Sequence, residues 1–351
     1  MAGNSLIGID IFCKEREIVP VIDVRSPSEF QKGHIVGAIN IPLFSDNERA
    51  IVGIKYKKSG RIEAVKAGLD IVGPKMSQMV SDAIKIAPNK KLLLYCWRGG
   101  MRSASMAWLF NQVGIETKTL IGGYKTYRRT AQLLFSKSYK IFVLGGMTGS
   151  GKTAILYELE KMGQQVLDLE GIANHKGSAF GGIGQKPQPT TEQFENNLFE
   201  KLHSINSDKL LWLEDESISI GSVFIPQPLF DQMRKAIRVA INRPIDIRVK
   251  RLEQEYSQLP SNYLVDAVKR ISKRLGSDNA NYCIESIEKG NFSKAIEICL
   301  RYYDKTYNYG LSQHGSNLIH LELNENNNAE SAEAILKEIN NLTSVKQTSQ
   351  S

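Results

Sequence analysis

The fold is constrained most by an eight-residue motif, Gly146-Met147-Thr148-Gly149-Ser150-Gly151-Lys152-Thr153. It satisfies the pattern G-x-x-x-x-G-K-[ST], with the apolar run 140–144 before it and an amphipathic stretch after it. This order predicts a strand, a phosphate-binding loop and a helix. The glycines let successive N–H groups converge on a phosphate chain. Lys152 is expected to bridge terminal phosphates, and the Thr153 hydroxyl is expected to coordinate Mg²⁺.

A partner carboxylate for such a loop is expected at the end of another strand. The apolar run 210–213 is followed by Glu214, Asp215 and Glu216, which resemble a Walker B element. The sequence leaves open which of the three is functional. It also leaves open whether the loop holds ATP or another phosphate chain.

A second loop, Cys96-Trp97-Arg98-Gly99-Gly100-Met101-Arg102-Ser103, follows the apolar run 92–95. A glycine-rich turn between a strand and a helix directs backbone N–H groups at the sulfur. These groups, with Arg98 or Arg102, are expected to lower the thiol pKa and make Cys96 a nucleophile. The spacing Cys-x₅-Arg is similar to that of cysteine phosphatases, in which the arginine binds the oxygens of the phosphate.

Strands alternate with helices through both halves of the chain, which predicts α/β domains with parallel sheets. Strands are expected near 18–24, 91–95, 115–120 and 140–144, and residues 33–42 are expected to form a turn and another strand. Helices are expected near 74–87 and 102–113. The polar segment 135–138 is interpreted as a linker. The predicted domains are therefore 1–137, 138–342 with a helical C-terminal part, and a flexible tail at 343–351.

Composition is that of a globular protein, with 42% hydrophobic and 23% charged residues. No apolar run is long enough to span a bilayer, and residues 1–16 lack the features of a signal peptide. We therefore expect a cytoplasmic protein without a membrane partner, with its four cysteines as free thiols.

Positive charge is concentrated between residues 234 and 274, where eleven basic and four acidic residues give a net charge of +7. A basic stretch of this kind favours contact with a nucleic-acid backbone. The residues expected to make that contact are Arg243, Arg248, Lys250, Arg251, Lys269, Arg270, Lys273 and Arg274.

The residues upstream of Cys96 resemble the rhodanese signature. They are the segment 23–30, which contains Asp23 and Arg25, and the segment 33–42. Many single-domain rhodaneses have a loop one residue shorter than the one after Cys96, so this loop has room for more than a terminal sulfur atom.

The fusion of this domain to the phosphate loop resembles the tRNA 2-selenouridine synthase family. Three further segments are also similar to that family: 169–181, 188–195 and 214–217. The first of them contains His175. The resemblance covers residues 18–255, and it implies an N-terminal rhodanese-like domain followed by a P-loop NTPase-like α/β domain.

The resemblance implies that sulfur in 2-thiouridine, at the wobble position of a tRNA anticodon loop, is replaced by selenium from selenophosphate. It also implies an S-geranylated intermediate made from geranyl diphosphate, with a selenophosphate-producing enzyme as supplier and no tightly bound organic cofactor. Cys96 would be the nucleophile or the carrier of selenium, and residues 98–102 its anion cradle. His175 would be an acid, a base or a phosphate donor, or would only order its loop.

Two alternatives belong to other functional classes. One is a small-molecule sulfurtransferase or cysteine phosphatase fused to a nucleotide-binding domain. The other is an RNA-binding regulator whose loops sense a nucleotide.

Overall fold

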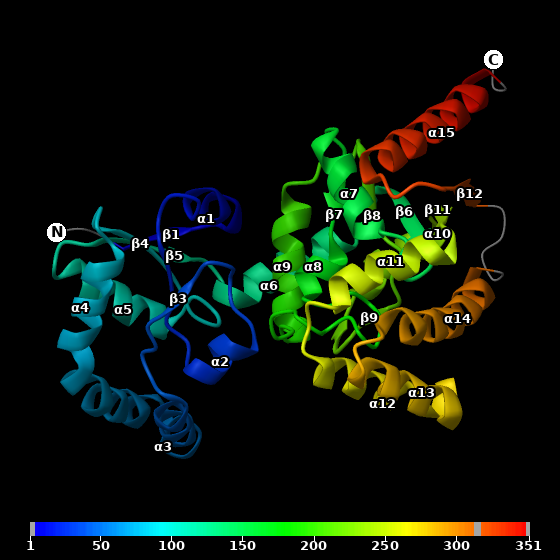
Figure 1. Cartoon of the computed structure of the whole chain (residues 1–351). Helices are drawn as coiled ribbons and strands as arrows, with labels where there is room; N and C mark the ends of the chain where they lie inside the picture. Colours follow the sequence, from blue (N-terminus) through cyan, green and yellow to red (C-terminus); the bar gives the residue numbers. More distant parts are fainter. Residues whose placement is uncertain (1–3, 312–316, 349–351) are drawn as a thin grey trace. The chain divides into compact units, whose positions relative to one another are not determined.

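The computed structural model describes residues 4–311 and 317–348, and the chain divides into two compact units (Figure 1). Unit 1 runs to Leu134 and also includes Glu195–Glu200, and unit 2 holds the rest of the chain. The first boundary therefore lies three residues before the predicted one. Within the described ranges, no helix is both long and apolar enough to cross a membrane.

Unit 1 is built on a parallel five-stranded sheet in the order β1-β5-β4-β2-β3. Its elements are β1 (Asn4–Ile7), α1 (Ile9–Glu15), β2 (Val21–Asp23), α2 (Pro27–Lys32), β3 (Ile39–Asn40), α3 (Asp46–Val72), the 3₁₀ helix η1 (Gly73–Lys75), α4 (Met76–Ile86), β4 (Lys91–Tyr95), α5 (Met101–Asn111), β5 (Glu116–Leu120) and α6 (Gly123–Phe135). Because the strands are parallel, the loops after β2, β3 and β4 leave from the same edge of the sheet.

The core of unit 1 forms where β2 and β4 meet helices α4 and α5. Ile22 and Leu94 from the central strands pack with Met106 and Phe110 of α5. Cys96 belongs to the same cluster, so the loop that follows β4 starts from a buried position. The expected strands and helices around Cys96 are confirmed, whereas α1, β1 and α3 were not predicted.

Unit 2 contains a second parallel sheet, in the order β12-β11-β6-β8-β7. Its strands are β6 (Lys140–Gly146), β7 (Gln165–Leu167), β8 (Leu210–Glu214), β11 (Ile237–Asn242) and β12 (Leu318–Glu322), and β9 (Ser219–Ile220) pairs separately with β10 (Val223–Phe224). Its helices are α7 (Lys152–Lys161), α8 (Leu169–Ala173), α10 (Gln227–Lys235), α11 (Ile245–Tyr256), α12 (Ser261–Leu275), α13 (Ser277–Glu288), α14 (Phe292–Leu311) and α15 (Asn328–Thr348), while α9 (Thr191–His203) is shared between the units.

Helices α12, α13 and α14 form the predicted helical part of unit 2, with a core of their own. Leu264, Val268 and Ile271 of α12 pack with Cys283 of α13 and Cys299 of α14. The predicted flexible tail, 343–351, overlaps α15, because this helix continues to Thr348. Residues 349–351 lie outside the described part of the chain.

Candidate functional site

Cys96 lies directly after the carboxyl end of β4, in the loop that leads to α5, and its side chain is buried. The Gly100 N–H donates to Sγ at 3.3 Å. The Ser103 Oγ lies at the same distance from Sγ and also donates to the Gly100 carbonyl at 3.1 Å. The sulfur is therefore surrounded by hydrogen-bond donors, as the sequence predicts.

These donors decide the protonation of the thiol. Burial raises the pKa of Cys96, but the Ser103 hydroxyl and the N–H groups of Ser103, Arg98 and Gly100 lower it by a larger combined amount. The pKa of Cys96 therefore lies below its ordinary value. Because the thiolate is the reactive form, the site favours nucleophilic chemistry at sulfur.

The backbone of this loop is fixed by the start of α6. The Tyr124 N–H donates to the Cys96 carbonyl at 2.9 Å, and the Lys125 N–H donates to the Trp97 carbonyl at 3.0 Å. Gly123 has a φ of +59°, and a Cβ at this position would lie 2.2 Å from the Cys96 oxygen. Only glycine therefore allows this close approach.

The predicted anion cradle is only partly formed by the residues proposed for it. Arg98 and Gly100 supply N–H groups to the sulfur, while the Met101 side chain is exposed. The guanidinium of Arg102 pairs with Glu29 at 2.7 Å. Gly99 has a φ of +63° and packs against the Leu120 carbonyl, so its contribution is to the path of the loop.

Asp23 and Arg25 form a buried ion pair and have a structural role. Two nitrogens of Arg25 donate to the Asp23 carboxylate at 2.7–3.1 Å, and the guanidinium lies 3.9 Å from the centre of the Tyr124 ring. Arg25 also donates to the Gly33 carbonyl at 2.7 Å. With exposures of 0% and 1%, the two residues are closed off from solvent and hold β2 and the Cys96 edge in place.

The predicted phosphate loop connects β6 to α7 and has the expected glycine conformations. Gly149 and Gly151 have φ values of +80° and +85°. Lys152 donates to the Gly146 carbonyl at 3.1 Å, and Thr153 donates to Glu170 at 3.0 Å. Met147 and Ser150 lie within the turn, where the Ser150 N–H donates to the Met147 carbonyl.

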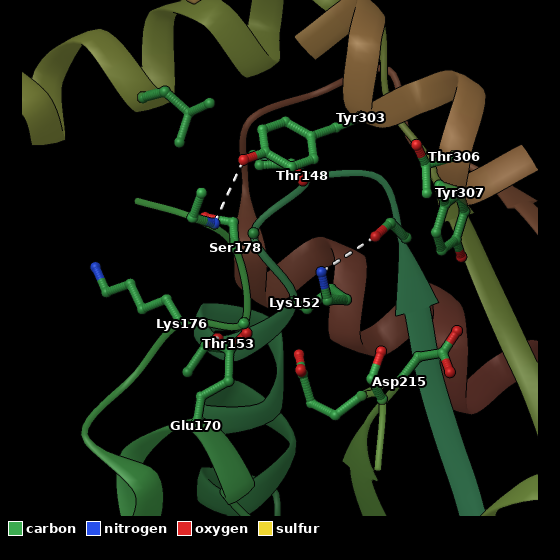
Figure 2. Close-up of a pocket in the computed structure, with 18 of the residues that line it drawn as sticks. Thr148, Lys152, Thr153, Glu170, Lys176, Ser178, Asp215, Tyr303, Thr306 and Tyr307 are labelled. Atoms are coloured by element: carbon green, nitrogen blue, oxygen red, sulfur yellow. Dashed lines mark hydrogen bonds between the residues drawn. The ribbon is translucent and has the colours of Figure 1, made fainter. Parts of the chain in front are cut away.

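A cavity of about 1170 Å³ opens beside this loop within unit 2. Figure 2 shows Lys152, Thr153, Glu170 and Asp215 on one side of it, and Tyr303 and Tyr307 on another. Its wall carries five basic residues (Lys152, Lys176, Arg234, Arg251 and Arg274) and four acidic ones (Glu170, Asp215, Glu216 and Glu255). It also carries the apolar or aromatic residues Phe230, Leu252, Tyr256, Ile271, Tyr302, Tyr303 and Tyr307. The cavity therefore suits a ligand with both an anionic and an apolar part.

The three acidic residues after β8 have different surroundings. Glu214 is fully buried and accepts from the Leu169 N–H at 3.1 Å, and burial and then the charges of Asp168 and Glu170 raise its pKa well above the ordinary value. Asp215 pairs with Arg238 at 2.9 Å and lines the cavity.

Glu216 also lines the cavity, where it faces Glu170 and Lys152. Burial and the charge of Glu170 raise the pKa of Glu216 to about 8, while Lys152 opposes the shift. Asp215 and Glu216, and not Glu214, are therefore the members of the trio that a ligand can reach.

The expected Mg²⁺ fits the oxygen donors beside the loop. The described residues contain no group of three or more His, Cys, Asp or Glu arranged to hold a metal ion. Mg²⁺ commonly takes one or two protein oxygens and completes its shell with phosphates and water. The Thr153 hydroxyl and Glu170, which are hydrogen-bonded to each other, would supply those protein ligands.

Sequence reasoning missed several groups that build these sites. Ser103 and Glu170 lie in segments that the motifs include, but only the structure shows their contacts with Sγ and Thr153. Glu29 lies 73 residues from Arg102 in the sequence, and no local pattern pairs them.

His175 lies outside the cavity wall. Burial lowers the pKa of His175, the charge of Glu170 opposes this shift, and the charge of Arg270 adds to it.

The residues predicted to contact tRNA divide into buried and accessible groups. Arg243 and Arg248 have exposures of only 1% and 3%. Arg248 pairs with Asp304 at 2.7 Å and donates to the Thr148 carbonyl, so it supports the phosphate loop. Their burial contradicts the predicted contact of these two residues with a nucleic-acid backbone.

The other members of the group remain accessible. Lys250, Lys269, Arg270, Lys273 and Arg274 are exposed, the last four on α12. Arg251 lines the cavity, and its guanidinium lies so close to Gly151 that a Cβ there would be 2.4 Å from Nη2. Asn326 and Asn328 accept from the same guanidinium.

Comparison with known proteins gives two adjoining matches. Residues 12–130 match a family described as the rhodanese-like domain, and residues 139–338 match the tRNA 2-selenouridine synthase AAA domain. The chain is 35% identical to the tRNA 2-selenouridine synthase of Sulfurovum sp., over 91% of this chain and 94% of that protein. For the proteins of the same name from Hydrogenovibrio crunogenus and Salmonella agona, identities are 36% and 34%, with 84% and 86% of this chain and 90% and 91% of those proteins covered.

Proposed function

Because the chain belongs to the tRNA 2-selenouridine synthase family, we propose that it replaces the sulfur of 2-thiouridine at the wobble position of tRNA by selenium. We further propose that selenophosphate supplies the selenium and that the reaction passes through an S-geranyl intermediate made from geranyl diphosphate. Both substrates and the tRNA would be met in the cytoplasm.

The cavity of unit 2 is proposed as the geranylation site. The phosphate loop would hold the diphosphate, while Tyr256, Tyr302 and Tyr303 would contact the prenyl chain. The 2-thio sulfur would attack C1 of the geranyl group as the C1–O bond breaks, the diphosphate would leave, and the N3 proton of the base would pass to solvent. Lys152 would stabilise the charge that develops on the leaving group. Mg²⁺ at Thr153 and Glu170 would supply further neutralisation.

Arg251 is proposed as a second cation for this diphosphate. Its guanidinium lies against Gly151, where α7 begins, and neutral amides hold it in position. Burial lowers the pKa of Arg251, with Glu255 opposing the shift. An anionic oxygen at the loop would stabilise this charge, which the neutral amides of Asn326 and Asn328 cannot neutralise.

Unit 1 is proposed as the site of selenium exchange. Geranylation converts the sulfur into a thioether-like leaving group. Selenium of selenophosphate would add to C2, the C2–S bond would break with geranyl thiol leaving, and water would cleave the Se–P bond to release phosphate. The lowered pKa of Cys96 and its N–H donors support a role for this residue as nucleophile or selenium carrier. The observation that carries the whole proposal is the cavity in unit 2, because it joins a phosphate loop to an aromatic wall.

The test is mass spectrometry of tRNA nucleosides from cells that lack the chromosomal gene and express wild type, Cys96→Ser or Lys152→Ala. Wild type should restore 2-selenouridine. Cys96→Ser should lose it and accumulate S-geranyl-2-thiouridine, whereas Lys152→Ala should lose both nucleosides. Equal amounts of both nucleosides with and without the protein would refute the proposal. Rapid hydrolysis of an aryl phosphate in that case would favour the phosphatase alternative.

A further inference from the structure

Helix α3 carries a basic segment that neither motif accounts for. Residues 49–62 contain Arg49, Lys55, Lys57, Lys58 and Arg61 and no acidic residue, which gives a net charge of +5. We call residues 49–62 the basic arm. This segment belongs to unit 1, far in the sequence from the basic stretch at 234–274.

The basic arm has little contact with the rest of unit 1. Of the 27 residues of α3, only Ala64 and Gly68 are buried. Every residue from 53 to 62 is exposed, including Tyr56 at 59%. Gly60 interrupts the helix with a φ of +83°, so the chain changes direction at the end of the lysine-rich part. The charges of residues 53–62 therefore face solvent.

The base of the arm is connected to the edge of the sheet that carries Cys96. Helix α3 follows β3, whose carboxyl end lies at the same edge as that of β4. Arg49, at the start of the arm, pairs with Glu29 at 3.0 Å, and Glu29 also pairs with Arg102 of α5. Ser28 donates to Asp46 in the first turn of α3. The arm therefore starts beside the reactive loop.

We propose that the basic arm binds the sugar-phosphate backbone of the substrate tRNA and brings it to the Cys96 edge of unit 1. A cluster of lysines without carboxylates is complementary to a phosphate backbone. The inference rests on the proposed tRNA substrate.

Binding of a tRNA transcript to the full chain, measured by fluorescence anisotropy over a range of salt concentrations, tests this inference. The arm variant is Lys55→Gln, Lys57→Gln and Lys58→Gln, all at exposed positions. The control variant is Lys85→Gln, Lys90→Gln and Lys91→Gln, which removes the same charge from exposed positions near the amino end of β4, opposite the Cys96 edge.

We expect the arm variant to bind tRNA about 10- to 100-fold more weakly. The magnitude of the slope of log affinity against log salt should fall by about 2 to 3, because binding releases about one counterion fewer for each phosphate contact that is lost. The control variant should keep both values. Unchanged alkylation of Cys96 would confirm that the arm variant is folded.

Equal affinity and slope for the two variants would overturn the inference. In that case the arm would serve another partner, such as an acidic protein or an anionic membrane. Failure of the wild-type chain to bind tRNA at all would instead contradict the proposed function. The two failures are therefore distinguishable.

Discussion

Replacing Ser103 by alanine should raise the pKa of Cys96, and the structure indicates by how much. The hydroxyl has a single proton and two acceptors in reach, the Sγ of Cys96 at 3.3 Å and the Gly100 carbonyl at 3.1 Å. When the Cys96 thiol is neutral, the Ser103 hydroxyl donates its proton to the Gly100 carbonyl. When the thiol ionises, the hydroxyl can turn its proton to the negatively charged sulfur.

The expected shift is the difference between these two hydrogen bonds. A hydrogen bond to a charged group contributes about 1.5–3 kcal/mol, and a neutral one about 0.5–1.5 kcal/mol. The thiolate therefore gains roughly 1–1.5 kcal/mol from Ser103, which corresponds to a change in pKa of about 1. At a pH below the pKa, the alanine variant should contain about tenfold less thiolate.

The assay is the rate of alkylation of Cys96 by iodoacetamide as a function of pH, followed by mass spectrometry of the Cys96 peptide. Identification of the peptide separates Cys96 from the other three cysteines, which are also buried. Ser105→Ala is the matched control, because Ser105 lies on the same helix with its side chain exposed. The control should titrate as wild type does.

A Ser103→Ala variant that titrates at the wild-type pH would refute this reasoning. The N–H groups of the loop would then account for the whole effect. A shift far above the expected value would indicate that the loop itself had moved.

Three further predictions concern other parts of the two sites. Gly123→Ala should destabilise the chain by more than about 1 kcal/mol in urea unfolding and slow alkylation of Cys96, because φ is +59° and the added Cβ meets the Cys96 carbonyl; Gly53→Ala, in open space, should not. Glu216→Gln should change the pH dependence of stability: the raised pKa of Glu216 stabilises the fold below its ordinary pKa, and this contribution is lost as pH rises to about 8. The glutamine variant should therefore lose less stability than wild type between about pH 5 and about pH 8, and parallel curves would contradict the assignment. Arg251→Ala should raise the KM for geranyl diphosphate about 10- to 100-fold while the KM for tRNA is kept, and an equal effect of Lys250→Ala would remove the distinction.

Much of the fold could be predicted because both functional loops lie between an apolar strand and a helix. Residues 92–95 and 141–144 are apolar runs of the length of a buried strand, and each leads into a glycine-containing loop. Helix α3 was not predicted: the part before Gly60 buries no side chain, and Ser59 and Gly60 separate it from the helically spaced residues Ile62, Val65 and Leu69. Segment 195–200 belongs to unit 1 by packing alone, for which no sequence signal exists.

The candidate sites were predictable where chemistry depends on neighbours in the sequence. Residues of the Cys96 loop and the phosphate loop were identified because their N–H groups act through local turns. Contacts between distant residues could not be predicted, and the pairing of Glu29 with both Arg49 and Arg102 is an example. The predicted contact of Arg243 and Arg248 with tRNA was wrong because both side chains are buried. The sequence does not distinguish a buried arginine from an exposed one.

The hydrogen bonds between the Cys96 loop and α6 decide which polar groups of the loop remain near the sulfur. The carbonyls of Cys96 and Trp97 are occupied by the Tyr124 and Lys125 N–H groups, while the Gly100 N–H and the Ser103 hydroxyl are turned to the sulfur. Soft metal cations, which thiolates usually capture, would meet hydrogen-bond donors here where they need further electron-pair ligands. We therefore expect the Cys96 thiolate to bind zinc or copper weakly.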